Sequence, residues 1–396
     1  MKGKMRDLTI KGVTMADFES IRPINDSEVK ETLDRLVNNP KLANTVIHFR
    51  FAKWPKWTYP LIALFLRNRL KKHALSIKNV NDFQHAVAPY MKRTIETTTK
   101  EFTVSGLERH DVDSPCLFIS NHRDIALDPA FVNWSLYRDG NATIRIAIGD
   151  NLLSQNWISD IMRLNKSFIV NRSAKTKREK LTASKELSAY IHHSLRNEGE
   201  HIWIAQREGR AKDGNDLTNP ALISMLALNK PKTQEFSDYL NELHVIPVSI
   251  SYEYDPCDLI KAKELHQLEV AGVYEKEDSE DIESISKGIS GFKGRVHVHF
   301  EAPLKNAASS RELAEMLDVS IQKHYKLFAS NIAAAQMLDI DLGDYDHGFS
   351  VAELNHAKMQ LQNRSRGVNA AVVAKLLSMY AAPVVNKLKH LKAGAN

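Results

Sequence analysis

From about residue 100 onward, short β-rich runs alternate with helical stretches, and this alternation most constrains the fold. Six runs of four to seven residues follow Lys100. Between them lie segments with helical periodicity, among them Lys175–Asn197. Such alternation is typical of an α/β domain with a largely parallel sheet. The predicted strands are Cys116–Ser120, Thr143–Ile148, Ser167–Val170, Ile202–Ala205, Val245–Ser251 and Val296–Phe300.

Helical patterns dominate both ends of the chain. Apolar residues spaced three and four apart predict helices in the first hundred residues and again from Ser309 onward. We therefore predict an α/β fold with a mostly parallel twisted sheet flanked by helices and extended by helical regions at both ends. The expected boundaries are 1–100 for the N-terminal helical region, 101–305 for the α/β domain and 306–396 for the C-terminal helical region.

The charge of the chain is unevenly distributed. The sequence holds 54 Lys and Arg and 48 Asp and Glu, which gives a formal net charge of +6. Ten of the basic residues and no acidic residue lie in Arg35–Asn81, and seven basic residues and no acidic residue lie in Leu354–Asn396. Such clustering indicates an anionic partner, which can be a membrane surface, a nucleic acid or a phosphorylated ligand.

The first basic segment also carries aromatic residues. Trp54 and Trp57 precede the apolar run Thr58–Leu66, which is too short to cross a bilayer, and four Lys and Arg follow it closely. Tryptophan favours the headgroup level of a membrane, and basic side chains are attracted to anionic lipid. Two interpretations stay open at this point: a segment that lies on a membrane, or a solvated helical subdomain.

The sequence also indicates a compartment. The first twenty residues have scattered charges and no continuous apolar stretch, so we predict no secretory signal. The apolar stretch Ala370–Val385 is short and contains Lys375 and Pro383, so we predict no membrane-spanning helix. The two cysteines, Cys116 and Cys257, exclude a disulfide scaffold and fit a reducing environment. We therefore expect a cytoplasmic protein.

The segment after the first predicted strand of the α/β region holds the most candidate catalytic side chains. An apolar run ends at Ser120 and is followed by Asn121, His122, Asp124 and Asp128. In an open α/β sheet, ligands bind outside the carboxyl ends of the strands. A histidine there can act as a general base when a carboxylate orients its ring. On this segment alone, a structural histidine beside a helix-capping Asp128 is an equal alternative.

Two later strands lead into basic residues. The run ending at Val170 leads to Arg172, and the run ending at Ala205 leads into a loop with a glycine and several charges. Guanidinium groups suit phosphate recognition because their planar fork offers paired donors. Taken singly, each of these cations is explained as well by an ordinary surface position. The loop residues of interest are Glu208, Gly209, Arg210 and Lys212.

In this order, the segments resemble the glycerolphosphate and lysophospholipid (1-acylglycerol-3-phosphate) acyltransferase family, in a divergent bacterial-type branch. The resemblance spans Phe102 to Tyr252 and covers four blocks of the family. Five residues separate the histidine of the first block from Asp128 where the family has four, so Asp124 stays a second candidate. The blocks are Asn121-His122 with Asp128, Phe168-Ile169 with Arg172, Glu208-Gly209 with Arg210, and the proline-containing strand Val245–Ile250.

The resemblance implies transfer of a fatty acyl group from acyl-CoA or acyl carrier protein to a hydroxyl of glycerol-3-phosphate or a lysophospholipid such as lysophosphatidate, in phospholipid biosynthesis. His122 would take the hydroxyl proton, and Asp128 or Asp124 would hold its ring. No metal and no cofactor besides the thioester co-substrate is implied, and a membrane is favoured over nucleic acid as the partner of Arg35–Asn81. The enzyme would thus lie peripherally on the cytoplasmic face. The implied phosphate-binding residues are Arg172, Arg210, Lys212, Glu208 and Gly209.

Two other functions stay open on the sequence. One is a metal-dependent phosphohydrolase with His122, Asp124 and Asp128 as ligands. The other is a non-enzymatic protein that binds an anionic membrane or a nucleic acid through its basic segments. The first would need further clusters of His or Asp, and a nucleic-acid binder would be expected to carry a recognisable helix-turn-helix, finger or RNA-binding signature. We recognise neither pattern in the sequence.

Overall fold

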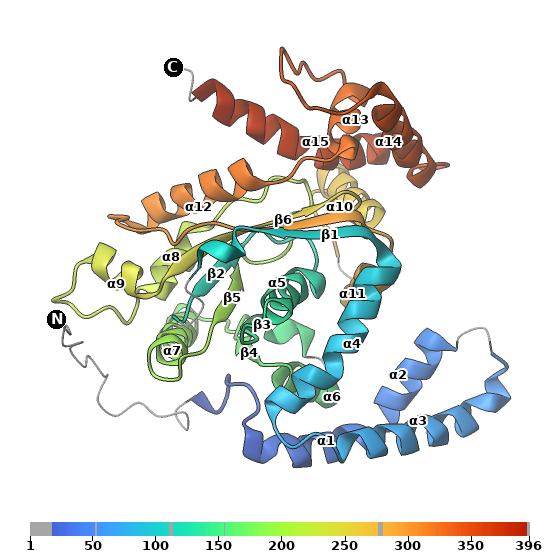
Figure 1. The fold of residues 1–396 in the computed structure, drawn as a ribbon, viewed down its shortest axis with the longest axis vertical. Helices are drawn as coiled ribbons and strands as arrows, with labels where there is room; N and C mark the ends of the chain where they lie inside the picture. Colours follow the sequence, from blue (N-terminus) through green and yellow to red (C-terminus); the bar gives the residue numbers. More distant parts are fainter. Residues whose placement is uncertain (1–17, 52–53, 111–113, 154, 276–279, 394–396) are drawn as a thin grey trace. The chain divides into compact units, whose positions relative to one another are not determined.

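The computed structural model divides the chain into two compact units, each built from two stretches of sequence (Figure 1). The first unit is Met1–Tyr90 with Ile144–Glu200, and the second is Met91–Thr143 with His201–Asn396. The domain boundaries expected from the sequence stay a prediction. The structure describes residues 18–51, 54–110, 114–153, 155–275 and 280–393.

The first unit is mainly helical and contains one pair of parallel strands. Val29 and Leu36 of its first helix pack with Leu164 in a small apolar core. An ion pair joins Arg35 and Asp160, with 2.9 Å between Nη2 and Oδ1. Its elements are α1 (Val29–Val37), α2 (Pro40–Arg50), α3 (Tyr59–Ala74), β3 (Arg145–Gly149), α6 (Asn156–Leu164), β4 (Ser167–Val170) and α7 (Lys177–Arg196), and α4 (Val80–Thr98) begins in this unit.

The second unit holds five strands: β1 (Thr99–Ser105), β2 (Leu117–Ser120), β5 (Ile202–Ala205), β6 (Val245–Tyr252) and β7 (Gly294–Phe300). They lie in the order β1-β7-β6-β2-β5. Neighbouring strands are parallel except β6 and β7, which are antiparallel. The helices of this unit are α5 (Leu127–Arg138), α8 (Pro220–Leu226), α9 (Phe236–Glu242), α10 (Asp258–Ala271), α11 (Glu280–Ser290), α12 (Ser310–His324), α13 (Ala329–Met337), α14 (Val351–Arg364) and α15 (Ala370–Ala393).

Strand β6 lies in the middle of these five strands and is buried at every position. Burial on both faces is typical of sheets covered by helices on both sides. The strand runs through Pro247, which has no N–H to donate, yet its carbonyl accepts from the Glu301 N–H at 3.0 Å. Next to it, the Asn121 side chain extends the pairing beyond β2, because its amide exchanges hydrogen bonds of 2.8 and 2.9 Å with the Ile250 backbone.

The sequence predicted the fold class and six of the strands, and both are confirmed: four of the five described strand pairs in the two units are parallel. Strand β1 was missed. Its sequence, TKEFTVS, has only Phe102 and Val104 as apolar positions. It lies at the end of the strand order beside β7 alone, and it is nowhere fully buried. An edge strand needs fewer apolar residues, and its sequence signal is correspondingly weak.

The C-terminal region is helical, as predicted. Leu361, Leu376 and Tyr380 are buried in a core formed by α13, α14 and α15. Within α15, Ala370–Lys389 has the length and composition of a membrane span, which makes it longer than the stretch considered from the sequence. Half of that window is buried inside the fold, so it also serves as part of this core.

Candidate active site

Three parallel strands of the second unit end at the same edge and bring the first predicted motif together with two other segments. His122 follows β2, a loop from Gln206 to Asn219 follows β5, and Tyr252 is the last residue of β6. Ligands of open α/β sheets bind at such an edge. The candidate site is therefore formed from residues far apart in the sequence, all within the second unit.

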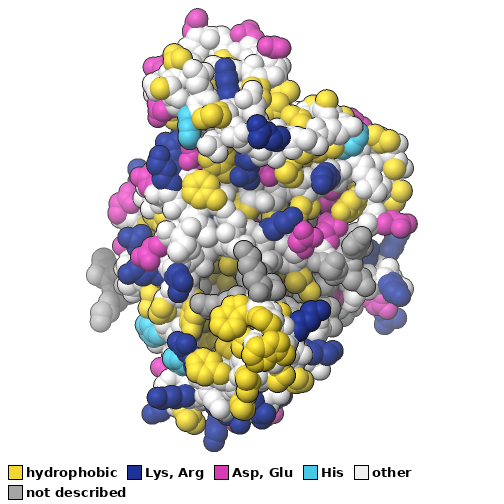
Figure 2. Space-filling model, turned by 90° about the vertical axis from the view of Figure 1, so that its right-hand side faces the viewer, with side chains coloured by type: hydrophobic (Ala, Val, Ile, Leu, Met, Phe, Trp, Pro, Cys, Tyr) yellow, Lys and Arg dark blue, Asp and Glu magenta, His cyan; other side chains and the backbone are white. Residues whose placement is uncertain are grey.

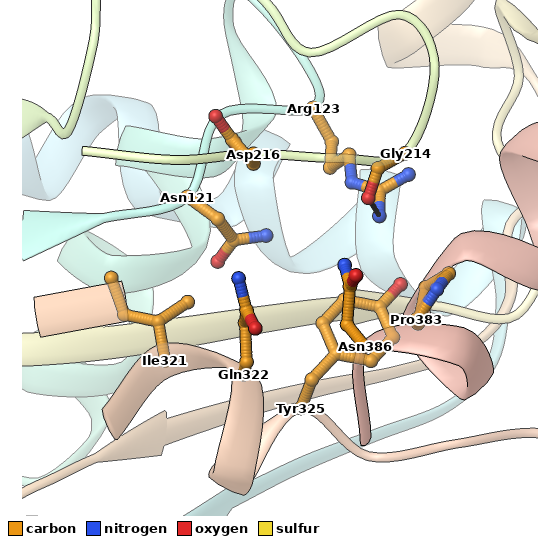
Figure 3. A pocket seen from close by; sticks show the side chains of 9 residues that line it. All are labelled: Asn121, Arg123, Gly214, Asp216, Ile321, Gln322, Tyr325, Pro383 and Asn386. Atoms are coloured by element: carbon orange, nitrogen blue, oxygen red, sulfur yellow. Dashed lines mark hydrogen bonds between the residues drawn. The ribbon is translucent and has the colours of Figure 1, made fainter. Parts of the chain in front are cut away.

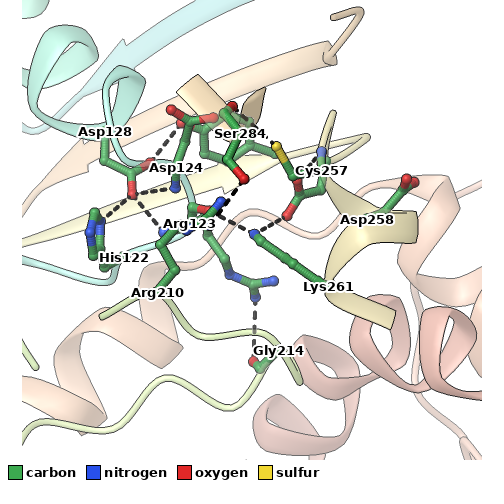
Figure 4. A network of polar contacts seen from close by, with 12 residues as sticks. His122, Arg123, Asp124, Asp128, Arg210, Gly214, Cys257, Asp258, Lys261 and Ser284 are labelled. Carbon is green, nitrogen blue, oxygen red and sulfur yellow. Dashed lines mark hydrogen bonds and ion pairs between the residues drawn. The ribbon is translucent and has the colours of Figure 1, made fainter. Parts of the chain in front are cut away.

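His122 and Asp128 form a hydrogen-bonded pair. The imidazole Nδ1 lies 2.9 Å from Oδ2 of Asp128, which is fully buried in the first turn of α5 (Figure 4). The same oxygen accepts the backbone N–H groups of Arg123 at 2.5 Å and Asp124 at 2.8 Å. The other oxygen, Oδ1, accepts the hydroxyl of Tyr252 at 2.6 Å. Four donors thus hold one carboxylate in a fixed position.

This arrangement decides which nitrogen of His122 is basic. A carboxylate only accepts hydrogen bonds, so Nδ1 carries the proton and Nε2 keeps its lone pair. Burial, together with the charge of Asp128, raises the pKa of Tyr252 well above its ordinary value, so this hydroxyl keeps its proton and donates. The His122 side chain is 14% exposed, so the ring remains accessible at the edge of the sheet.

The second carboxylate candidate, Asp124, has a different position. Its Oδ1 accepts the backbone N–H groups of Ala126 at 2.9 Å and Leu127 at 2.8 Å, so it caps the start of α5. Gly288 of α11 packs so closely that a Cβ there would lie 2.2 Å from Oδ2 of Asp124. Burial, and next the charge of Asp128, raise the pKa of Asp124. Of the two predicted candidates, the structure places Asp128 against the imidazole.

The loop after β5 holds the backbone of His122 from both sides. The His122 N–H donates to the carboxylate of Asp216, and its carbonyl accepts the N–H of Ala211 at 2.9 Å. Trp203 of β5 packs edge-on against the imidazole, with ring centroids 5.8 Å apart. Burial raises the pKa of Asp216. The ring is thus oriented through the main chain and through Asp128.

The same loop carries the predicted phosphate-binding cations. Arg210 directly precedes Ala211, and its Nη2 lies 3.3 Å from the hydroxyl of Ser284 on α11. Lys212 forms an ion pair with the buried Glu264 of α10, so part of its charge is already balanced. Of these two cations, Arg210 has the more suitable surroundings for an anionic ligand.

The other two predicted residues of this loop are exposed. Glu208 and Gly209 form the tip of the loop before Arg210. Gly209 has a φ of +74°, in the left-handed region where a residue with a side chain is disfavoured, so glycine allows the loop to turn here. The structure therefore assigns Gly209 a backbone role, and leaves the role of Glu208 as predicted from the resemblance.

Arg172 belongs to the first unit and is described with it. It follows β4, and its N–H donates to Oδ1 of Asp150 at 3.1 Å. Its side chain packs on Gly149 at the end of β3, where a Cβ would lie 2.8 Å from the Arg172 Nε. The side chain thus passes over the end of the neighbouring strand, as predicted for a residue at the carboxyl edge.

A small polar cavity lies beside the His122 loop (Figure 3). The guanidinium of Arg123 enters it, donates to the Gly214 carbonyl at 3.3 Å and lies 5.6 Å from the ring centroid of Tyr325. Among the described residues, Arg123 Nε and Asp216 Oδ1 are buried without a hydrogen-bond partner, and both residues line the cavity. Its size suits about one ordered water molecule.

Several residues of the site were missed by the sequence interpretation. Tyr252 donates its hydroxyl to Asp128, and Asp216 accepts the backbone N–H of His122. Lys261 of α10 donates to the Arg123 carbonyl at 2.6 Å. A tyrosine at the end of a largely apolar strand was a usable signal, since its hydroxyl needs a partner when buried. Asp216 and Lys261 lie in polar segments with no distinguishing pattern.

The metal interpretation of this motif finds no support in the geometry. In the part of the chain that the structure describes, one group of three side chains has metal-ligand spacing, and it consists of His299, Glu301 and His324. His122 and Asp128 are not in that group, and they bond to each other.

Residues 101–251 match the family model described as Acyltransferase. This part of the chain is similar to the acyltransferase family. The matched range contains His122, Asp128, Arg172 and Arg210, in agreement with the resemblance drawn from the sequence. No curated protein matches the chain significantly.

Among solved structures, the chain resembles the crystal structure of the 1-acyl-sn-glycerophosphate (LPA) acyltransferase PlsC from Thermotoga maritima. The identity is 13%, the TM-score is 0.37, and the match covers 75% of this chain and 92% of that chain. This likeness is too distant to carry an argument about substrate or mechanism.

Proposed function

We propose that this acyltransferase-family chain transfers a fatty acyl group from a thioester, acyl-CoA or acyl carrier protein, to a hydroxyl of glycerol-3-phosphate or a lysophospholipid such as lysophosphatidate. The observation that carries the proposal is the His122–Asp128 pair at the carboxyl end of β2. It supplies an imidazole that is held through Nδ1, so that Nε2 is the nitrogen left for a substrate at the sheet edge where ligands of this fold class bind.

In the proposed reaction, Nε2 of His122 takes the proton of the acceptor hydroxyl as its oxygen attacks the thioester carbonyl carbon. The new C–O bond forms, the C–S bond breaks, and the imidazolium returns the proton to the departing thiolate. Asp128 stabilises the imidazolium in between. Cys116 and Cys257 are both buried, and this direct transfer uses neither of them.

The acceptor phosphate is assigned to Arg210, which lies in the loop that clamps the His122 backbone in the second unit. Arg172, at the end of β4 in the first unit, stays a phosphate-binding residue that the resemblance implies. A guanidinium can donate two parallel hydrogen bonds to a phosphate, which suits a glycerophosphate headgroup. Lys212 contributes less in this proposal because Glu264 already pairs with it.

The basic aromatic segment Arg35–Asn81 is proposed to bind the anionic membrane in which such acceptors reside. On α3, Leu61 and Phe65 are 66% and 64% exposed, and Trp57 just before the helix is 76% exposed. Figure 2 shows hydrophobic side chains gathered on one face with Lys and Arg side chains nearby. Exposed aromatic and apolar residues next to basic ones suit the interface of an anionic bilayer.

One assay tests the reaction. Purified protein is incubated with mixed acyl-CoA and acyl carrier protein donors and a panel of glycerophosphate and lysophospholipid acceptors. Products are identified by mass spectrometry and thiol release is followed in parallel. We expect one class of acyl ester, formed with one thiol released per ester. Thiol release without any acylated glycerophosphate, or no turnover with any donor, would contradict the proposal.

A separate flotation assay tests the membrane surface. Wild-type protein is expected to float with phosphatidylglycerol vesicles, and a variant with Trp57, Leu61 and Phe65 all changed to Ser is expected to remain in the soluble fraction. Salt-dependent retention of RNA without vesicle binding would instead support a nucleic-acid partner and overturn this part of the proposal.

A further inference from the structure

A second histidine cluster, in the second unit, has the geometry of a metal site. His299 is the last residue but one of β7, and Glu301 directly follows the strand. His324 is the last residue of α12. The Nε2 atoms of His299 and His324 lie 3.5 and 3.0 Å from Oε2 of Glu301, and the three atoms lie within 4.8 Å of one another.

Hydrogen bonds on the outer side of the cluster orient Nε2 of His324 and Oε2 of Glu301 toward its centre. The Nδ1 of His324 lies 3.0 Å from the carbonyl of Ser320, which can only accept, so Nδ1 carries a proton and the neutral ring has its lone pair on Nε2. The second carboxylate oxygen of Glu301 accepts the N–H of Ala302 at 2.8 Å. Hence the Nε2 lone pair of a neutral His324 and Oε2 of Glu301 are both directed toward the centre of the cluster.

The contacts of His299 fit the same pattern. Its Nδ1 lies 2.8 Å from the hydroxyl of Ser105 on β1, and that hydroxyl also lies 3.0 Å from Nε2 of His297. A single hydroxyl can accept from one imidazole while it donates to the other. In the described part of the chain, the buried Nε2 of His299 has no hydrogen-bond partner. A metal ion is a natural partner for such a nitrogen.

We propose that His299, His324 and Glu301 bind a zinc ion, with a fourth position for a water molecule. Zinc binds imidazole nitrogen and carboxylate oxygen at about 2.0 to 2.2 Å, so neighbouring ligands of a tetrahedral ion are about 3.4 Å apart. The observed separations of 3.0 and 3.5 Å lie on either side of that value. Calcium and magnesium prefer all-oxygen ligand sets and fit this donor set poorly.

An ordinary ion pair explains the cluster less well. One protonated histidine would be enough to neutralise Glu301, and the second would gain little. Here both imidazoles present Nε2 to the same oxygen of Glu301, at 3.5 Å from His299 and 3.0 Å from His324. Hydrogen bonds to the outer nitrogens of zinc-bound histidines are typical of metal sites.

None of the three proposed zinc ligands belongs to the His122–Asp128 pair, so we assign the ion to the packing of the second unit. It would fix the end of α12 to β7 and, through Ser105, to β1. The next residue after His324 is Tyr325, whose ring faces the guanidinium of Arg123 in the cavity beside the His122 loop (Figure 3). Metal binding would therefore stabilise the elements that support one wall of that cavity.

The test uses the full chain, stripped with a chelator and dialysed against zinc, with bound metal measured by mass spectrometry. We expect about one zinc per chain in wild type and in the exposed control His356→Gln, and loss of most of it in Glu301→Gln and His324→Gln. Ser105→Ala is expected to weaken zinc binding by about 10- to 100-fold, because it removes the outer contact of His299.

A second readout does not depend on the variants folding. Cobalt added to the stripped wild-type chain is expected to give the strong visible absorption of a tetrahedral ion, which zinc then displaces. Less than about a tenth of an equivalent of bound zinc, a weak octahedral cobalt spectrum, or full zinc content in both Glu301→Gln and His324→Gln would overturn the proposal.

Discussion

The two histidine clusters of the second unit turn opposite nitrogens toward their carboxylates. His122 directs Nδ1 at Asp128 and is left with Nε2 as a base at the sheet edge. His299 and His324 use Nδ1 for outer hydrogen bonds and direct Nε2 at Glu301. In both clusters a hydrogen bond holds Nδ1, so the difference lies in what Nε2 faces: the open edge of the sheet at His122, and the carboxylate of Glu301 at His299 and His324.

The local structure explains the difference. Asp128 sits in the first turn of a helix that begins a few residues after His122, so the histidine and its carboxylate belong to one short loop-and-turn segment. Glu301 instead follows a strand, and its partner His324 comes from a different helix. The first arrangement leaves Nε2 of His122 for a substrate. The second makes three side chains converge on one point.

The largest expected effect among the supporting residues is that of Asp128→Asn. An amide in place of the carboxylate loses the fixed tautomer and the stabilisation of the imidazolium, so kcat is expected to fall by about 10⁴-fold. The matched control is Asp124→Asn, which keeps an oxygen for the backbone N–H groups and should retain kcat within about threefold. Equal losses in both variants would remove the distinction between the two carboxylates.

Arg210→Ala is expected to act on the acceptor. Loss of a charged hydrogen-bond donor of this kind is worth about 1.5 to 3 kcal/mol, so the acceptor KM should rise by about 10- to 100-fold with little change in the thioester KM. Arg207→Ala, at an exposed position of the same loop, is the control. A rise in the thioester KM alone would show that Arg210 binds the donor.

Tyr252→Phe removes one of the four donors to Asp128 and is expected to lower kcat by about tenfold, with KM unchanged. Tyr239→Phe is a suitable control, because this buried hydroxyl donates to the Leu226 carbonyl away from the pair. If kcat is the same in both variants, the Tyr252 hydroxyl does not help to hold Asp128.

The smallest effect concerns stability. Because burial raises the pKa of Asp124 above 3.8 in the folded state, wild type loses stability as pH rises from that value through the folded-state pKa. Asp124→Asn has no such loss, so its free energy of unfolding relative to wild type should increase from about pH 4 to pH 7. Urea denaturation at both pH values measures this, with exposed Asp213→Asn as control. A constant difference would contradict the assignment.

The sequence predicted those parts of the molecule that follow from local pattern. Buried strands such as Val245–Tyr252 stand out because apolar residues dominate them, and His122 was recognised because it directly follows such a strand. It could not distinguish Asp124 from Asp128, because the turn that directs one carboxylate to the ring depends on backbone N–H positions. It also missed the cluster around Glu301, whose members come together only through the packing of α12 against the sheet.

The most direct test of the proposed base is the rate of acyl transfer by His122→Ala. Removal of Nε2 is expected to lower transfer by at least about 10⁴-fold, while the circular dichroism spectrum and Tm stay those of wild type. Zinc content should also remain unchanged, since the second cluster does not use this residue. Transfer within about tenfold of wild type by the folded variant would show that His122 is not the base.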